Sequence, residues 1–131
     1  ARRRRPVDAA ELAATPLVAR EPGSGTRYAL EAVLAGLGDL AAPLVELSST
    51  TAIKAAVQAG VGPAVLSSLT VASEVADGRL IALQVAGVDL TRTLRAVWPA
   101  GQGLTGVLRD VLAVATLRSR EAPTSTTRPL R

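Results

Sequence analysis

Apolar positions along this chain switch between two spacings, and the switching predicts an α/β architecture. Four short apolar runs are typical of buried strands: residues 15–21, 42–48, 63–68 and 79–85. Three stretches between them carry apolar residues at helical spacing: residues 28–37, 48–60 and 70–78. Because strands joined by helices of this length form parallel crossover units, we expect a mixed, mostly parallel sheet with flanking helices.

The remainder of the chain predicts one more strand, one more helix and a tail. Residues 92–98 alternate in polarity, with Leu94 and Trp98 on the same side, which is typical of a strand. Apolar residues at helical spacing predict a helix over 104–117. Residues 118–131 are rich in Ser, Thr and Pro, which indicates a disordered tail.

The sequence lacks several residue types, and their absence limits the catalytic and metal-binding sites that the chain can form. The sequence has no Cys and no His, which excludes disulfides, thiolate metal sites and nucleophiles activated by histidine. No pair of carboxylates has a spacing that suggests acid–base work, so we predict that the chain is not an enzyme and uses no metal or cofactor. No apolar run approaches the ~20 residues of a membrane span, so we expect no membrane partner.

The net charge of +4 comes from the two ends of the chain. Residues 1–13 carry +2 and residues 116–131 carry +3, whereas the middle carries −1. A nucleic-acid-binding surface usually combines a basic face with aromatic residues that stack on bases, and this pattern is missing. We therefore interpret residues 1–13 as a basic amino-terminal segment that is solvated rather than bound to phosphate.

The stretch REPGSGTR, residues 20–27, turns the chain from a predicted strand into a predicted helix. Ser24 or Thr26 is expected to cap the helix, and the free N–H groups of the first turn suit a carboxylate or another anion. A dinucleotide-binding turn is the alternative, because two glycines precede the helix and Glu46 ends the next strand. Tyr28 stands where that motif has its third glycine, and its ring would obstruct close packing of helix on strand.

Two blocks of the sequence resemble the effector-binding domain of LysR-type transcriptional regulators. They are REPGSGTR and the stretch ELSSTTAIKAAVQAGVGPAVLSSLTVASEVADGRLIALQVAGVDLTRTLRAVW, and the resemblance covers roughly residues 12–117 in order. It implies a periplasmic-binding-protein-like fold of type 2, in which two lobes enclose a small-molecule effector. A free-standing solute-binding protein of the same fold, or a Rossmann-like nucleotide-binding enzyme, remains the alternative.

The resemblance also divides the chain. Residues 14–90 look like the second lobe, and residues 91–117 look like the crossover strand and last helix of an incomplete first lobe. The family's winged helix-turn-helix has no counterpart here and Met is absent, so we expect a piece of a longer, cytoplasmic, homo-oligomeric regulator that touches DNA only through another domain. Leu94, Trp98, Val107 and Val111 would then be under-buried, and we expect self-association.

By the same resemblance the effector, which could be an anion, would lie against three loops. The implied ligand-binding residues are Ser24, Gly25, Thr26, Ser49, Thr50, Gly60, Val61, Gly62 and Pro63. Each also has a plain structural role as a turn, a cap or a helix stop. Among the charged residues, Arg20, Arg27 and Lys54 could neutralise a carboxylate, whereas Glu74 and Asp77 are interpreted as surface residues.

Overall fold

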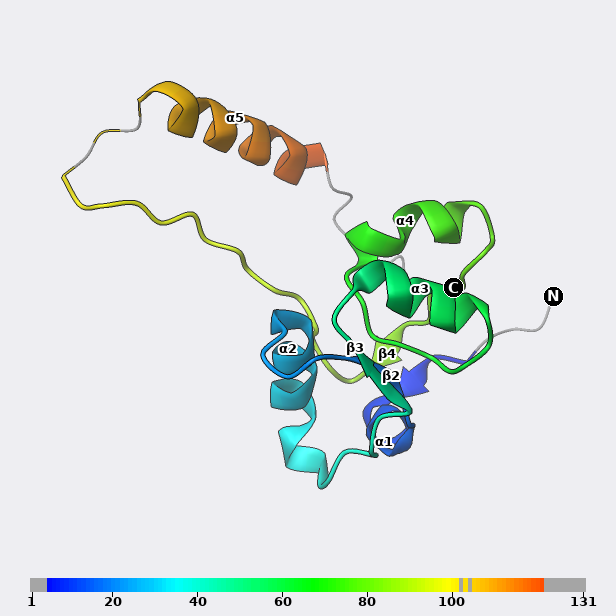
Figure 1. The fold of residues 1–131 in the computed structure, drawn as a ribbon. Helices are drawn as coiled ribbons and strands as arrows, with labels where there is room; N and C mark the ends of the chain where they lie inside the picture. Colours follow the sequence, from blue (N-terminus) through cyan, green and yellow to red (C-terminus); the bar gives the residue numbers. More distant parts are fainter. Residues whose placement is uncertain (1–4, 102, 104, 122–131) are drawn as a thin grey trace, which may run out of the picture. The chain divides into compact units, whose positions relative to one another are not determined.

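The computed structural model describes residues 5–101, 103 and 105–121. The chain forms two compact units, Ala1–Arg92 and Thr93–Arg131, which we call the first unit and the second unit. The first unit holds nearly all of the regular structure: β1 Val7–Asp8, α1 Ala9–Ala14, β2 Val18–Arg20, α2 Gly25–Leu34, the 3₁₀ helix Ala35–Leu37, β3 Val45–Leu47, α3 Thr50–Gln58, α4 Ser68–Ala76 and β4 Val85–Ala86. The second unit holds α5, Gly106–Glu121 (Figure 1).

Two parallel strand pairs organise the first unit. β2 pairs with β3, so that Val18 lies opposite Val45 and Arg20 opposite Leu47. β1 pairs with β4, and Val7 lies opposite Val85. Both pairs are parallel, as the alternation of strands and helices predicts, and the described residues therefore form a mixed α/β fold with small parallel sheets.

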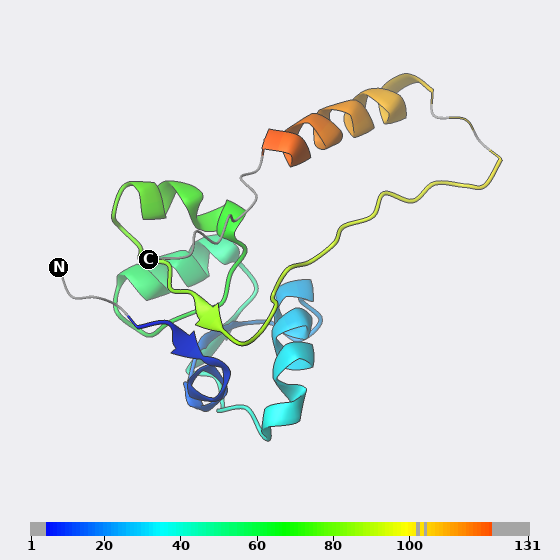
Figure 2. The same cartoon turned by 180° about the vertical axis from the view of Figure 1, so that it is seen from behind.

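α2 and α3 contact β2, whereas α1 contacts β1 and β4 (Figures 1 and 2). Leu12, Ala13 and Leu34 form a core cluster, against which Leu17 and Val65 pack. Val18 follows Leu17 and faces the opposite way, as successive strand residues do, and it is also buried. α3 contacts both strands and contributes Ile53, which is fully buried.

Local sequence explains where α3 begins and ends. The Ser49 hydroxyl accepts a hydrogen bond from the Ala52 N–H at 3.3 Å, which satisfies a donor that the first turn leaves free. At the other end Gly60 has a φ of +81°, a left-handed conformation that glycine adopts without steric cost. The predicted cap and the predicted stop are both confirmed.

The second unit differs from the first in the exposure of its apolar side chains. Residues 93–101 form no strand or helix, and α5 is the only helix among the described residues of this unit. Large apolar side chains are exposed along both parts: Leu94, Val97, Trp98, Val107, Leu108, Val111 and Val114. The predicted under-burial of Leu94, Trp98, Val107 and Val111 is confirmed.

The structure departs from the sequence-based expectations mainly in its strands. The stretches predicted as strands at 63–68 and 92–98 have no assigned strand, and the one predicted at 79–85 is reduced to β4. A strand needs a neighbouring ladder, and within the described residues 92–98 has none. Residues 9–14, for which the sequence indicated no element, form α1, and residues 118–121 belong to α5 rather than to the predicted tail, whose residues 122–131 lie outside the described ones.

Candidate functional site

The turn after β2 brings Ser24 to the start of α2. The Ser24 N–H donates to the Glu21 carbonyl at 3.2 Å, and the Tyr28 N–H donates to the Ser24 carbonyl at 2.9 Å. Ser24 is only 7% exposed, yet its hydroxyl makes no capping hydrogen bond. Ser24 therefore occupies the cap position, as predicted, but leaves the N–H groups of the first turn without a side-chain partner.

A second helix start, that of α3, follows β3 at the same end of the sheet. Because β2 and β3 run parallel with Arg20 opposite Leu47, the turn before α2 and the turn before α3 leave the same end of the sheet. We call this end, with the first turns of α2 and α3, the carboxyl edge. It brings together five of the residues that the resemblance implied: Ser24, Gly25, Thr26, Ser49 and Thr50.

The loop of residues 60–63 lies at the opposite end of β2. The Val18 N–H, at the start of that strand, donates to the Pro63 carbonyl at 2.9 Å. A β-carbon on Gly62 would clash with Leu44 Cδ1 and would lie 3.9 Å from Val18 Cγ2, so close packing requires glycine there. Gly60, Val61, Gly62 and Pro63 are thus not brought together with the residues of the carboxyl edge.

Chain direction points to a further residue at the carboxyl edge. α3 starts at that edge and leads back to the loop of residues 60–63. Residues 64–66 therefore return alongside β2. There Val65 lines a small hollow together with residues 17–20. The return ends at Ser67, the residue before α4, whose hydroxyl also makes no capping hydrogen bond. Sequence reasoning missed Ser67, although a Ser-Ser pair after an apolar run was a usable helix-start signal.

Two arginines that flank the turn are bound to carboxylates. Arg20 holds Glu21 through two hydrogen bonds of 2.7 and 2.9 Å, and this pairing lowers the pKa of Glu21. Arg27 donates to Glu31 at 2.7 Å, to the Arg20 carbonyl at 3.0 Å and to Glu46. Hydrogen bonds to Glu31 and then Glu46 raise the pKa of Arg27. Both guanidinium groups already have carboxylate partners, so neither is available to neutralise a ligand carboxylate.

The same contacts weaken the dinucleotide alternative, although not for the reason predicted. Tyr28 is 74% exposed, so its ring does not stand between the helix and the strand. The acidic residue that would bind a ribose is Glu46, and Arg27 already occupies its carboxylate.

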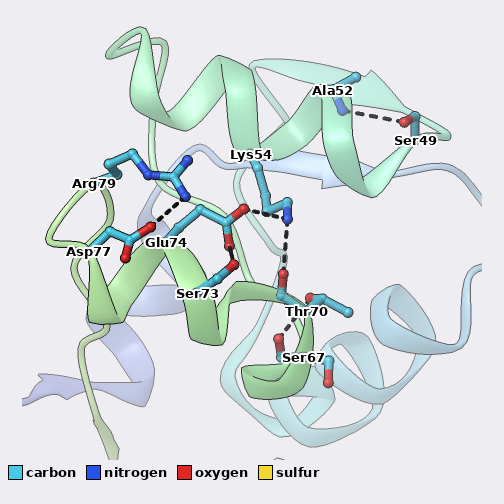
Figure 3. A network of polar contacts seen from close by, with 9 residues as sticks. All are labelled: Ser49, Ala52, Lys54, Ser67, Thr70, Ser73, Glu74, Asp77 and Arg79. Atoms are coloured by element: carbon cyan, nitrogen blue, oxygen red, sulfur yellow. Dashed lines mark hydrogen bonds and ion pairs between the residues drawn. The ribbon is translucent and has the colours of Figure 1, made fainter.

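Lys54 serves a structural role between α3 and α4 (Figure 3). Its ammonium lies 2.7 Å from Glu74 Oε1 and donates to the Thr70 carbonyl at 3.1 Å. Ser73 Oγ donates to the other carboxylate oxygen of Glu74 at 3.0 Å. Hydrogen bonds to the Glu74 carboxylate, the one from Lys54 first, lower the pKa of Glu74 to about 2. The interpretation of Glu74 as a surface residue is wrong, because its side chain is buried against this lysine, whereas Asp77 is exposed and pairs with Arg79.

The described part of the chain contains neither a group of metal-binding side chains nor a membrane-spanning helix. There, no three Asp or Glu side chains gather into a possible metal site. Among the same residues, no helix combines the length and the apolar character needed to cross a bilayer.

Comparison with known families decides the class. The chain matches the LysR substrate binding domain family over residues 1–118, which reaches further toward the amino end than the stretch of 12–117 that suggested the resemblance. The chain belongs to the LysR substrate-binding domain family.

Three relatives of this LysR domain carry the names of transcriptional regulators. An uncharacterized HTH-type transcriptional regulator of Mycobacterium tuberculosis is 49% identical over 124 residues, which are 91% of this chain and 40% of the relative. The HTH-type transcriptional regulator CbbR of Xanthobacter flavus is 43% identical over 115 residues, 82% of this chain and 34% of the relative. The RuBisCO operon transcriptional regulator of Acidithiobacillus ferrooxidans is 38% identical over 99 residues, 76% and 32% of the two chains. The chain thus spans about two fifths or less of the length of these relatives.

Proposed function

We propose that this chain is the effector-binding module of a LysR-type transcriptional regulator and that its effector lies against the carboxyl edge. The observation that carries the proposal is the convergence of helix starts there. α2 and α3 begin where two neighbouring parallel strands end, and their first N–H groups and dipoles favour a polar or anionic group. Open parallel sheets bind their ligands at this end.

The family supports a finer reading of the fold, which we include in the proposal. In this reading residues 14–90 are one lobe of a type 2 periplasmic-binding-protein-like domain, and residues 91–117 contribute to the other lobe. Effector binding would then shift the balance between two arrangements of the lobes, by no more than the effector's difference in affinity for them. Such a module is a sensor rather than an enzyme.

The names of the relatives suggest the setting in which the module works. They are transcriptional regulators, two of them named as HTH-type, and this chain spans 40% or less of each one. We propose that DNA contact belongs to a helix-turn-helix of a longer, homo-oligomeric and cytoplasmic protein, and that residues 1–131 sense a small molecule.

Calorimetric titration of the chain with inorganic phosphate, malonate and glucose tests the proposal. We expect saturable binding of one of these classes with one molecule per chain. Ser24→Ala and Ser67→Ala should each weaken that binding several-fold, because each removes a hydroxyl that the protein leaves without a capping bond.

Val61→Ala is the control that distinguishes a binding site at the carboxyl edge from one at the other end of β2. Val61 is exposed in the loop of residues 60–63, and its truncation should leave the affinity unchanged if the site is the carboxyl edge. Weaker binding in Val61→Ala with normal binding in the serine variants would move the site to that loop. No binding of any of the three compounds would reject the proposed sensing role of the isolated chain.

A further inference from the structure

α4 is joined to the rest of the first unit differently from the other helices of that unit. α1, α2 and α3 each contact a strand extensively, whereas α4 has no contact of that extent with any described helix or strand. The other three helices also bury apolar side chains, such as Leu12 of α1, Leu34 of α2 and Ile53 of α3. The only buried residue of α4 is Glu74. The apolar core therefore contributes little to holding α4 in place.

The apolar side chains of α4 lie largely in solvent. Leu69 is 77% exposed, Val75 is also exposed, and Val71 is half-buried. Elements with few buried apolar contacts are those that open most readily in a folded protein. α4 has only nine residues, and a helix of this length is not stable in water without packing. We therefore expect α4 to melt when it leaves α3.

Lys54 supplies the side-chain hydrogen bonds between α3 and α4 (Figure 3). Lys54 Nζ donates to Glu74 Oε1 at 2.7 Å and to the Thr70 carbonyl at 3.1 Å. Thr70 and Glu74 lie one helical turn apart, so the ammonium joins two successive turns of α4. The side chains of Lys54 and Glu74 are only 20% and 10% exposed. We call these contacts of Lys54 with α4 the clasp.

A buried ion pair makes docking depend sharply on both partners. The cost of removing two charges from water offsets most of their attraction, so the intact pair stabilises the docked helix only modestly. The loss of one partner leaves the other charge buried and uncompensated, which is strongly unfavourable. The docked position of α4 thus depends on the clasp more than on any other contact of this helix.

We infer that α4 is a detachable flap, which the clasp holds against α3 and which opens as a unit while β2, β3 and α3 stay folded. α4 follows Ser67, which lies at the carboxyl edge, so opening would withdraw this serine from the proposed effector. The flap would then regulate the proposed effector site, and this consequence rests on the proposed function. An effector that contacts Ser67 only in the closed form would shift the balance toward that form.

Hydrogen exchange of backbone amides, followed by NMR in urea below the unfolding transition, tests the flap in the unmodified chain. The amides of residues 72–76 in α4 should exchange faster than those of residues 54–58 in α3. Their exchange should also depend less on urea, because opening of α4 exposes less surface than global unfolding. Equal protection and equal urea dependence in the two helices would show that α4 unfolds only with the rest of the unit, which would overturn the inference.

Two variants test the clasp in the same measurement. Lys54→Met and Glu74→Gln should each raise the open fraction of α4 by roughly ten- to a hundredfold, the loss expected for a hydrogen bond to a charged group. Because both side chains act through one contact, the double variant should open α4 no further than the more damaging single variant. Effects that multiply in the double variant would show that the two residues act independently, and would overturn the clasp.

Asp77→Asn is the matched control, because Asp77 follows the last residue of α4 and pairs with Arg79 at 2.9 Å. Both of these side chains are exposed, so the open fraction should change by no more than about fivefold. An effect as large as that of Glu74→Gln would mean that any lost negative charge opens α4, and would overturn the clasp. Exchange is measured without a ligand, so a failure of the flap and a failure of the calorimetric titration can be told apart.

Discussion

The two units of this chain use similar amino acids with opposite results. The first unit contains every residue that is buried in the described structure: Leu12, Ala13, Val18, Ser24, Leu34, Ile53 and Glu74. The described part of the second unit contains large apolar side chains as well, but Leu94 is 86% exposed and Val97 is 87% exposed. Apolar content alone therefore does not create a core.

The comparison shows that the local sequence pattern determines whether a helix forms, whereas contacts with other segments determine whether its apolar side chains are buried. α3 and α5 both follow from apolar residues at helical spacing, and both form. Ile53 of α3 is buried because β2 and β3 lie against it, whereas Val111 of α5 remains exposed. Helical spacing fixes the element, and burial depends on residues elsewhere in the chain.

Matched leucine deletions should give the largest difference between the units. Leu34→Ala removes a side chain that is 1% exposed in the core cluster, and should reduce the free energy of unfolding by about 2–5 kcal/mol. Leu94→Ala should change it by less than about 0.5 kcal/mol, since the side chain already meets solvent. Urea unfolding followed by circular dichroism measures both. Equal losses would show that Leu94 packs in solution and would end the comparison.

The ion pairs of the two units should respond differently to acid. The pKa of Glu74 is lowered from 4.5 to about 2, so its contribution to stability is complete above pH ~4.5 and disappears as the pH falls toward 2. Glu74→Gln should lower the melting temperature at pH 7 and flatten its dependence on pH between about 4.5 and 2.

Asp110→Asn is the corresponding change in the second unit. Asp110 lies 3.6 Å from Arg109, and both side chains are exposed, so the pair contributes little. The melting curve of this variant should follow that of the unmodified chain at every pH. A profile for Glu74→Gln as steep as that of the unmodified chain would contradict the assigned role of the Lys54–Glu74 pair.

Hydroxyl deletions should differ in sign as well as in size. Ser49→Ala removes the cap of α3 and should cost about 1 kcal/mol of unfolding free energy. Thr116→Ala removes a hydroxyl that bonds the Leu112 carbonyl within α5, and alanine favours helix over threonine by up to about 0.7 kcal/mol. Helix content from circular dichroism should therefore fall in the first variant and rise in the second. A fall in both would mean that the Thr116 contact stabilises α5.

The sequence predicted the first unit well wherever the signals were local. The strand before REPGSGTR, the cap at Ser49 and the stop at Gly60 all lie where spacing and residue type indicated. α1 was missed because residues 9–14 form fewer than two helical turns, whose burial depends on contact with Val85 and Leu34. The strand at 92–98 was overpredicted because alternation cannot reveal whether a neighbouring strand exists.

The candidate site was predictable in part for the same reason. The starts of α2 and α3 could be assigned from glycines and hydroxyls next to apolar runs. Their convergence required the register of β2 on β3, which pairs residues 27 positions apart. The approach of Arg92 to Gly25 was likewise not predictable, because only the fold brings these two residues together. Likewise, the burial of Glu74 depends on Lys54, which lies 20 residues earlier.

The smallest effect on stability should come from replacing exposed valines. These valines should instead distinguish the two units by how strongly they promote self-association of the chain. Val111 lies one helical turn from Val107 and from Val114, so the three form an apolar stripe on α5. Val61 is similarly exposed, at 51% against 58% for Val111, but it lies in a loop. Replacing either valine by serine should change the free energy of unfolding by less than about 0.5 kcal/mol.

Association should nevertheless respond to Val111 alone. Burying a continuous stripe removes more apolar surface from water than burying one loop side chain, so the stripe supplies the larger driving force for contact between chains. In light scattering across a concentration series, Val111→Ser should lower the average mass at high concentration, whereas Val61→Ser should match the unmodified chain. A monomer at all concentrations in the unmodified chain would show that the exposed side chains of the second unit do not drive self-association.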